Sequence, residues 1–210
     1  MLDIELAGET MTLDARRAMF WQRERWLKIA DLHLGKASLL RQAGAAVPTG
    51  STSRDLERLS SLVDDYRPAR LVILGDLTHG AETQDALWLQ RLAQWRHERQ
   101  QLAITLVAGN HDQHMVLPEL DIEVVASLHQ GPFQFSHAPT KCHDRHVIAG
   151  HLHPGARFRD GRLVQRWPAF WIGHRLSVLP AFGSLTGLSP QSAHRADQVF
   201  AVTPGGMLAL

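Results

Sequence analysis

Short apolar runs that each stop at a polar residue constrain this chain more than any other feature of its sequence. Runs at residues 71–74, 102–107 and 146–149 have the length and composition of buried strands, residues 26–30 those of a half-buried strand, and residues 133–135 are a shorter strand candidate. Each run is followed within three residues by Asp, Asn or His, often beside a glycine. Because ligands bind beyond the carboxyl ends of strands in open α/β sheets, we expect these five loops to converge on one site.

Helical periodicity fills some of the segments between these runs. Apolar residues recur at helical spacing in residues 56–63 and again within residues 83–99. Further strand candidates, separated by Gly and Pro after the last helical segment, lie at residues 163–167, 175–179 and 199–202. Residues 2–6 alternate as a half-buried strand does. The pattern predicts an α/β fold in which two packed sheets carry helices on the outside.

Composition limits the class of protein. The chain has 210 residues with a 44% apolar fraction, so we expect one domain, residues 1–210, with a substantial core. The formal net charge of +1 excludes a strong overall nucleic-acid footprint, so any such contact must come from a local patch. Cys142 is the single cysteine, and we find neither a signal peptide nor a membrane segment, which favours a cytoplasmic protein. Residues 42–52 are expected to form a loop, either a surface connection or a flap over the site.

The residue types at the strand ends suit divalent metal ions. Carboxylate and amide oxygens combined with imidazole nitrogens favour Mn, Fe or Zn over Ca. Asp31-Leu32-His33 and His151-Leu152-His153 would each place two ligands on one side of an extended segment, because side chains alternate with period two. Each motif alone has an ordinary explanation as a turn or a polar pair. In this order, each at a strand end, they predict a metal site.

The complete series of motifs resembles that of the calcineurin-like metallophosphoesterases. The motifs are Asp31-x-His33, Gly75-Asp76-x-x-His79, Gly109-Asn110-His111-Asp112, a single His137 and Gly150-His151-x-His153. The resemblance implies a four-layer αββα sandwich and an enzyme that hydrolyses phosphate esters. It also implies two divalent metal ions as cofactors, with manganese preferred and iron or zinc as alternatives.

The resemblance also assigns the ligands. One ion would be held by Asp31, His33, Asp76 and His153. The second ion would be held by Asp76, Asn110, His137 and His151. Asp76 then bridges the two, because a shared carboxylate offsets the repulsion between cations about 3.5–4 Å apart.

Other polar residues are assigned to the substrate. We expect His111 to protonate the leaving oxygen or to stabilise charge on the phosphoryl group, with Asp112 orienting its ring. His79 is expected either to contact the substrate or to support a metal ligand, and Arg175 is a candidate phosphate contact. Many relatives have Asp where this chain has His79, or Glu where it has Asp112. Neither position is a ligand in the family scheme.

Further motifs resemble a narrower group, the bacterial DNA ligase-associated metallophosphoesterases. These motifs occupy residues 31–36, 44–48 and 179–187. Members of that group are encoded beside a DNA ligase, a helicase and an exonuclease. The resemblance therefore implies that this chain binds DNA and that these three repair proteins are candidate partners. We expect no association with a membrane.

Three functions are compatible with these motifs. The leading prediction is a phosphodiesterase or endonuclease that acts on single-stranded or damaged DNA in repair. A hydrolase of small phosphoesters, such as cyclic nucleotides or phosphomonoesters, is the alternative. An inactive scaffold of a repair complex is a third, although the complete ligand set argues against it. The arginines between residues 157 and 166 form a local basic cluster, which we interpret as a solvated hairpin, and Trp167 and Trp171 could be core or could stack a base.

Overall fold

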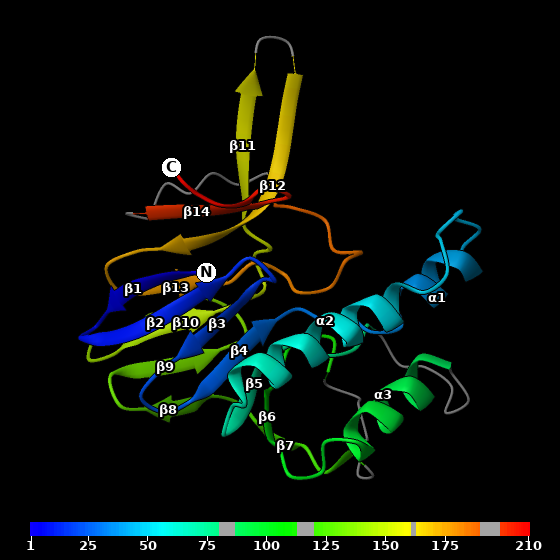
Figure 1. Ribbon diagram of the computed structural model, residues 1–210, viewed down its shortest axis with the longest axis horizontal. Coiled ribbons are helices and arrows are strands. Elements are labelled where there is room, and N and C mark those ends of the chain that lie inside the picture. The colour runs from blue at the N-terminus through cyan, green and yellow to red at the C-terminus, as the bar shows by residue number, and fades with distance from the viewer. Residues whose placement is uncertain (80–86, 113–119, 161–162, 190–197) are drawn as a thin grey trace.

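The computed structural model of the protein describes residues 1–79, 87–112, 120–160, 163–189 and 198–210. Two β-sheets pack face to face, and helices cover the outer face of the first sheet (Figure 1). This arrangement confirms the predicted α/β sandwich. Within the described ranges, none of the helices combines the length and apolarity that a membrane crossing requires.

The first sheet joins an antiparallel meander to a parallel half. Its strands follow chain order: β1 (Leu2–Leu6), β2 (Glu9–Asp14), β3 (Ala18–Trp21), β4 (Trp26–Ala30), β5 (Arg70–Leu74), β6 (Ala103–Val107) and β7 (Glu123–Val125). Strands β1 to β4 pair antiparallel, and β4 to β7 pair parallel. Parallel neighbours need crossover connections. These contain helices α1 (Lys36–Gln42) and α2 (Ser51–Tyr66) between β4 and β5, and α3 (Leu87–His97) between β5 and β6.

The second sheet has its parallel strands in the middle. Its order is β15 (Gly206–Ala209), β14 (Gln198–Thr203), β12 (Leu163–Ile172), β13 (Leu176–Val178), β10 (His146–Ala149), β9 (Phe133–Ser136) and β8 (Leu128–Gln130). Strands β9, β10 and β13 run parallel. Strand β11 (Gly155–Asp160) pairs with β12 as a hairpin that extends away from both sheets (Figure 1).

Side-chain alternation along the central strands supplies two cores. In β5, Leu71 and Ile73 pack with α2 and α3, whereas Val72 and Leu74 pack against the second sheet. The helices contribute Leu56, Leu59 and Leu62 from α2 and Trp88, Leu92 and Trp95 from α3. Within the described residues, the outer face of the second sheet is covered by a smaller cluster around Ala169, Trp171 and Ala201, without a helix.

Most predicted elements are confirmed, with differences at their boundaries. The helix expected within residues 83–99 is α3, and residues 83–86 lie outside the described ranges. The loop expected at residues 42–52 is shortened, because α1 ends at Gln42 and α2 begins at Ser51. Strand β12 is longer than its predicted segment and continues through Pro168. The elements β2, β3 and α1 were not predicted from the sequence.

The segment at residues 179–187 ties the two sheets together beside the strand ends. Its Leu179 donates a backbone hydrogen bond to Ala149 at the end of β10, and Phe182 donates one to Ala30 at the end of β4. Helix α2 holds the same segment through Asp55, which accepts hydrogen bonds from the backbone and hydroxyl of Ser184 at 3.0 and 3.1 Å. The loops that follow β4 and β10 are thereby fixed relative to each other.

Lys28 occupies an unusual place in the core between the sheets. Its side chain is fully buried and lies 5.3 Å from the ring centre of Trp21 and 5.7 Å from that of Phe135. Its Nζ contacts the sulfur of Met11 at 3.8 Å and the carbonyl oxygen of Trp26 at 3.5 Å, and no carboxylate pairs with it among the described residues. Burial therefore lowers the pKa of Lys28 well below its ordinary value.

We expect Lys28→Met to raise the free energy of unfolding at neutral pH and to flatten its pH dependence. The unfolded chain protonates Lys28 up to about pH 10.4, whereas the folded state disfavours the charged amine. The unfolded state therefore binds more protons, and the free energy of unfolding rises as the pH approaches about 10.4. The limiting slope is about 1.4 kcal/mol per pH unit. Urea unfolding at several pH values measures the slope. The exposed Lys141→Met is the matched control and should leave it unchanged; equal slopes for both variants would contradict the assignment.

Candidate metal centre

Strand register brings the predicted site loops to one edge of the sandwich. Ala30, Leu74 and Val107 are paired across β4, β5 and β6, so the loops that follow these strands lie side by side. In the second sheet Ser136 pairs with Ala149, which places the loops after β9 and β10 next to each other. The convergence of five loops is therefore observed.

The backbone at this edge is held in a rarely populated conformation. Five of the ten non-glycine residues with positive φ in the described chain are predicted ligands: Asp31 (53°), His33 (50°), Asp76 (49°), His151 (68°) and His153 (46°). Our expectation that the Asp-x-His and His-x-His pairs lie on extended segments was therefore wrong. Each ligand of the two pairs instead has a positive φ, a backbone conformation that costs energy and that clusters at functional sites.

One group of donors comprises Asp31, His33 and His153, whose ligand atoms lie within 4.8 Å of one another. His33 Nε2 lies 3.3 Å from His153 Nε2, and His153 Nε2 lies 3.7 Å from Asp31 Oδ1. Asp31 is fully buried; its Oδ2 accepts a hydrogen bond from the backbone of His151 at 2.8 Å. Its Oδ1 has no hydrogen-bond partner in the described part of the chain. A buried carboxylate oxygen without a donor is a position that fits a cation.

A second group comprises Asp76, His137 and His151, with Asn110 beside them. His137 Nδ1 lies 3.0 Å from the carbonyl oxygen of Leu74, which can only accept, so Nδ1 carries the proton of the neutral ring. The lone pair of Nε2 then faces the Oδ1 of Asn110 at 3.0 Å, which is another acceptor. His151 Nδ1 lies 2.9 Å from His137 Nε2 as well. Converging lone pairs are the arrangement that a metal ion satisfies.

Asp76 is a member of the second group that also lies close to the first. Its Oδ2 lies 3.6 Å from His33 Nε2 and 3.5 Å from His137 Nε2, while its Oδ1 accepts a hydrogen bond from the backbone of His111 at 3.0 Å. One carboxylate oxygen thus faces an imidazole of each group. This is the position of a bridging ligand.

Glycines make this crowding feasible. Gly75 has a φ of +77°, and a Cβ there would lie 2.1 Å from His137 Nδ1. A Cβ at Gly109 would lie 2.3 Å from Asp76 Oδ1. Both positions therefore exclude any side chain, because the backbone must approach the ligand directly.

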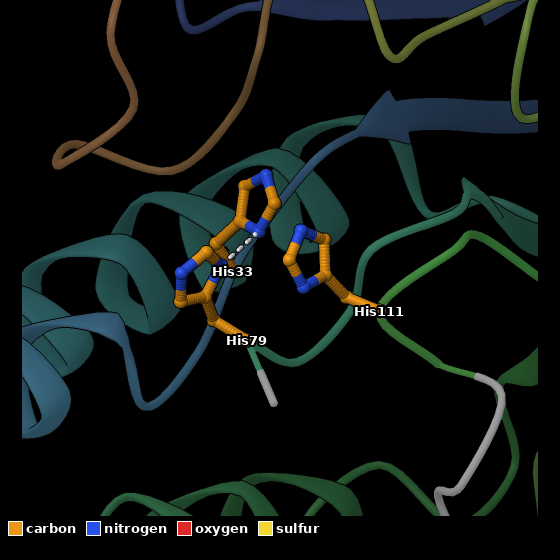
Figure 2. A group of neighbouring side chains, drawn as sticks. All are labelled: His33, His79 and His111. Carbon is orange, nitrogen blue, oxygen red and sulfur yellow. Dashed lines mark hydrogen bonds between the residues drawn. The ribbon is translucent and has the colours of Figure 1, made fainter. Parts of the chain in front are cut away.

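Three imidazoles form a further cluster at the edge of the first group. Figure 2 shows His33, His79 and His111 facing one another, from the loops that follow β4, β5 and β6. His79 Nδ1 lies 3.0 Å from His33 Nδ1, and the rings of His79 and His111 stack with centres 4.5 Å apart. Burial lowers the pKa of His33 to about 2, with smaller effects from Lys36 and the neighbouring histidines. His33 is therefore neutral and keeps a lone pair for a metal ion.

Comparison with known proteins agrees with this geometry. The family described as Calcineurin-like phosphoesterase matches residues 26–144. The chain belongs to this family. The crystal structure of Pseudomonas putida nuclease MPE is similar over 100% of this chain and 99% of that chain, with a TM-score of 0.87 and 33% sequence identity. Comparison with curated protein sequences gave no match.

A second solved structure shows only a weak likeness. The YfcE phosphoesterase from E. coli aligns over 85% of this chain and 88% of that chain, at 17% identity and a TM-score of 0.41. So low a score supports no conclusion about this chain. The calcineurin-like phosphoesterases bind divalent metal ions, and the His and Asp groups described above provide suitable donors for them.

Two predicted site residues of this phosphoesterase are placed differently from expectation. Asp112 was expected to orient His111, but its oxygens accept backbone hydrogen bonds from Gly109 at 2.9 Å and Thr78 at 3.3 Å. The tight turn directs its carboxylate back onto the loop, which it ties to the loop after β5. Burial raises the pKa of Asp112.

Arg175 is not brought to the centre. Strand β13 runs parallel to β10, and Val147 pairs with Leu176, so Arg175 lies at the amino end of both strands. His151 follows the carboxyl end of β10. Arg175 also donates a hydrogen bond to the carbonyl oxygen of His143, away from the candidate ligands. The structure therefore does not support Arg175 as a phosphate contact in the phosphoesterase site.

Lys36 is a site residue that the sequence analysis did not single out. It is the first residue of α1, and its charge adds to the effect of burial, which lowers the pKa of both His33 and His79. Burial lowers the pKa of Lys36 itself, and the charge of Asp76 partly opposes this shift. Its position five residues after Asp31, at the start of a helix, was the only signal available. A lysine here offers a phosphate a positive charge.

We expect Asp76→Asn to abolish high-affinity metal binding in both donor groups. A neutral amide cannot offset the repulsion between two divalent ions as a shared carboxylate does. Metal analysis after equilibration with saturating Mn²⁺ should find about two ions per wild-type chain and fewer than one in the variant. Asp64→Asn, an exposed change on α2, is the control and should retain the wild-type metal content. A variant that still binds two ions would rule out the bridging role.

Proposed function

We propose that this phosphoesterase is a nuclease that uses two divalent metal ions to hydrolyse phosphodiester bonds in single-stranded or damaged DNA. The observation that carries the proposal is the position of Asp76 Oδ2, within 3.6 Å of an imidazole nitrogen of each donor group. The similar protein from Pseudomonas putida is described as a nuclease, which supports a polymeric substrate. Manganese suits a donor set of imidazole, carboxylate and amide groups, and iron or zinc would also fit.

The residues around the donor groups have distinct tasks in this proposal. Bound metal ions would supply an activated water nucleophile and charge neutralisation at the phosphate. Asp31, His33, Asp76 and His153 would hold one ion, and Asp76, Asn110, His137 and His151 the other. Lys36 would add positive charge beside the phosphate that these residues bind.

His79 can both support a ligand and contact the substrate. His33 Nε2 lies beside His153 and Asp76, and a metal ion bound to it would leave the proton of the neutral ring on Nδ1. His79 Nδ1, at 3.0 Å, would then accept a hydrogen bond from His33, which places the proton of His79 on Nε2. His79 therefore orients His33 and offers its own N–H to a phosphate oxygen. Its stacking on His111 orients that ring in place of Asp112.

A cytoplasmic location and repair partners are part of the same proposal. The only cysteine, Cys142, is a free thiol, which fits a reducing compartment. A DNA ligase, a helicase and an exonuclease are the candidate partners that the narrower resemblance implies. Co-purification from cells under low salt would test these associations.

A substrate panel tests the proposed function directly. With Mn²⁺ present, we expect cleavage of single-stranded DNA to exceed cleavage of duplex DNA, a cyclic nucleotide and a phosphomonoester. A strong preference for the cyclic nucleotide would instead identify a small-molecule phosphodiesterase. Lack of turnover of all four substrates by the metal-loaded protein would favour an inactive scaffold.

We expect His111→Asn to slow DNA cleavage by about 10²–10⁴-fold, the usual contribution of general acid catalysis. A DNA strand leaves as a strongly basic alkoxide, whereas nitrophenolate leaves without a proton. A nitrophenyl phosphodiester should therefore be affected far less, and metal content should remain intact. His129→Asn on the exposed surface of β8 is the control. Equal losses on both substrates would show that His111 stabilises the phosphoryl oxygens instead, and loss of metal would make it a ligand.

A further inference from the structure

The β11–β12 hairpin directly follows the candidate ligands His151 and His153 in the chain. Strand β11 begins at Gly155, two residues after His153. Strand β12 runs antiparallel to β13, which is parallel to β10. The first half of β12 therefore extends past the carboxyl end of β10, the end from which His151 and His153 emerge. The hairpin projects from the site edge of the second sheet (Figure 1).

The outer part of this hairpin has little structural support. Residues 155–160 pair only with residues 163–168, whereas β12 joins β14 and β13 through residues 169–172. Among the strands that the structure describes, no third strand pairs with the outer part. Two-stranded hairpins are marginally stable in water, so unfavourable pairs in this segment carry a cost.

The register places positive charges in such an unfavourable pair. Arg157 is directly opposite Arg166, and Arg159 lies two residues further along the same face of β11. All three arginines are exposed. Neither Arg157 nor Arg166 forms an ion pair within the described ranges. Like charges directly opposite each other destabilise a strand pair, so the pairing of Arg157 with Arg166 does not stabilise the hairpin.

The arginine face is the one that faces inward further along β12. Side chains alternate along a strand, so Arg166 shares a face with Phe170 and Ile172, which pack between the sheets. Trp167 lies on the other face, in the cluster on the outside of the second sheet. By alternation, the arginines therefore lie on the face of the hairpin that becomes the inner face of the sheet further along β12.

We propose that the β11–β12 hairpin is an arm that binds the phosphate backbone of a DNA strand leading away from the metal centre. The inference rests on the proposed nuclease function and names the surface that holds its substrate. Three cations spaced along an extended hairpin match a linear polyanion better than one compact phosphate. A bound strand would also screen the repulsion between Arg157 and Arg166, which has no compensation within the described fold.

The double variant Arg157→Gln/Arg166→Gln tests the arm. Binding of a fluorescent single-stranded oligonucleotide, measured by anisotropy over a range of salt concentrations, should show a log–log slope shallower by about 1.4, since each contact with a single strand contributes about 0.7. The same relation predicts a loss of affinity of about 25-fold at about 0.1 M salt. Turnover of a nitrophenyl phosphodiester and metal content should stay at wild-type values.

The control removes two exposed arginines from the opposite end of the first sheet. Arg25 precedes β4 and Arg67 precedes β5, so Arg25→Gln/Arg67→Gln changes the net charge equally, far from the candidate ligands. Equal DNA affinity and salt slope for the two double variants would contradict the proposal that the hairpin binds DNA. A parallel loss of nitrophenyl turnover would also overturn it, because the hairpin would then act on the metal centre itself. Wild-type protein that binds DNA through the arm but does not cleave it would refute the nuclease function alone.

Discussion

The shared carboxylate oxygen of Asp76 is the contact on which the whole site depends. It faces His33 in one donor group and His137 in the other, at 3.6 and 3.5 Å, and these histidines come from different sheets. The segment at residues 179–187 holds the two sheets in register beside it, through hydrogen bonds to Ala149 and Ala30. The sandwich thus positions the Asp76 carboxylate between imidazoles of both donor groups, an arrangement that suits a pair of cations.

The local structure of the site is costly in the absence of a cation. Five predicted ligands have left-handed backbones, and Asp31 buries a carboxylate oxygen that accepts no hydrogen bond from the described residues. Glycines at residues 75 and 109 leave no space between the backbone and the ligands. Such features persist only where the surrounding packing enforces them, and here two large cores and α2 do so. The energetic cost of these features is therefore concentrated at the residues where a bound cation would offset it.

The fold class and the convergence of the candidate ligands could be predicted because each candidate follows an apolar run, and parallel register brings such strand ends together. The direction of single strands and side chains could not be predicted. Arg175 lies at the wrong end because β13 runs parallel to β10, and Asp112 turns back onto its own loop. Residues 26–30 were predicted as a half-buried strand, whereas packing of the second sheet buries the side chain of Lys28 completely. The outcomes for Arg175 and Lys28 depend on contacts between residues distant in sequence, and Asp112 also accepts a hydrogen bond from Thr78 in a different loop.

The most direct test of the account is a crystal structure of the Mn²⁺-loaded protein with anomalous diffraction measured at the manganese edge. The account predicts two anomalous peaks, one among Asp31, His33 and His153 and the other among Asn110, His137 and His151, both in contact with Asp76. A single peak would contradict the bridging role of Asp76. A peak among His33, His79 and His111 would contradict the assignment of His79 and His111 to the substrate.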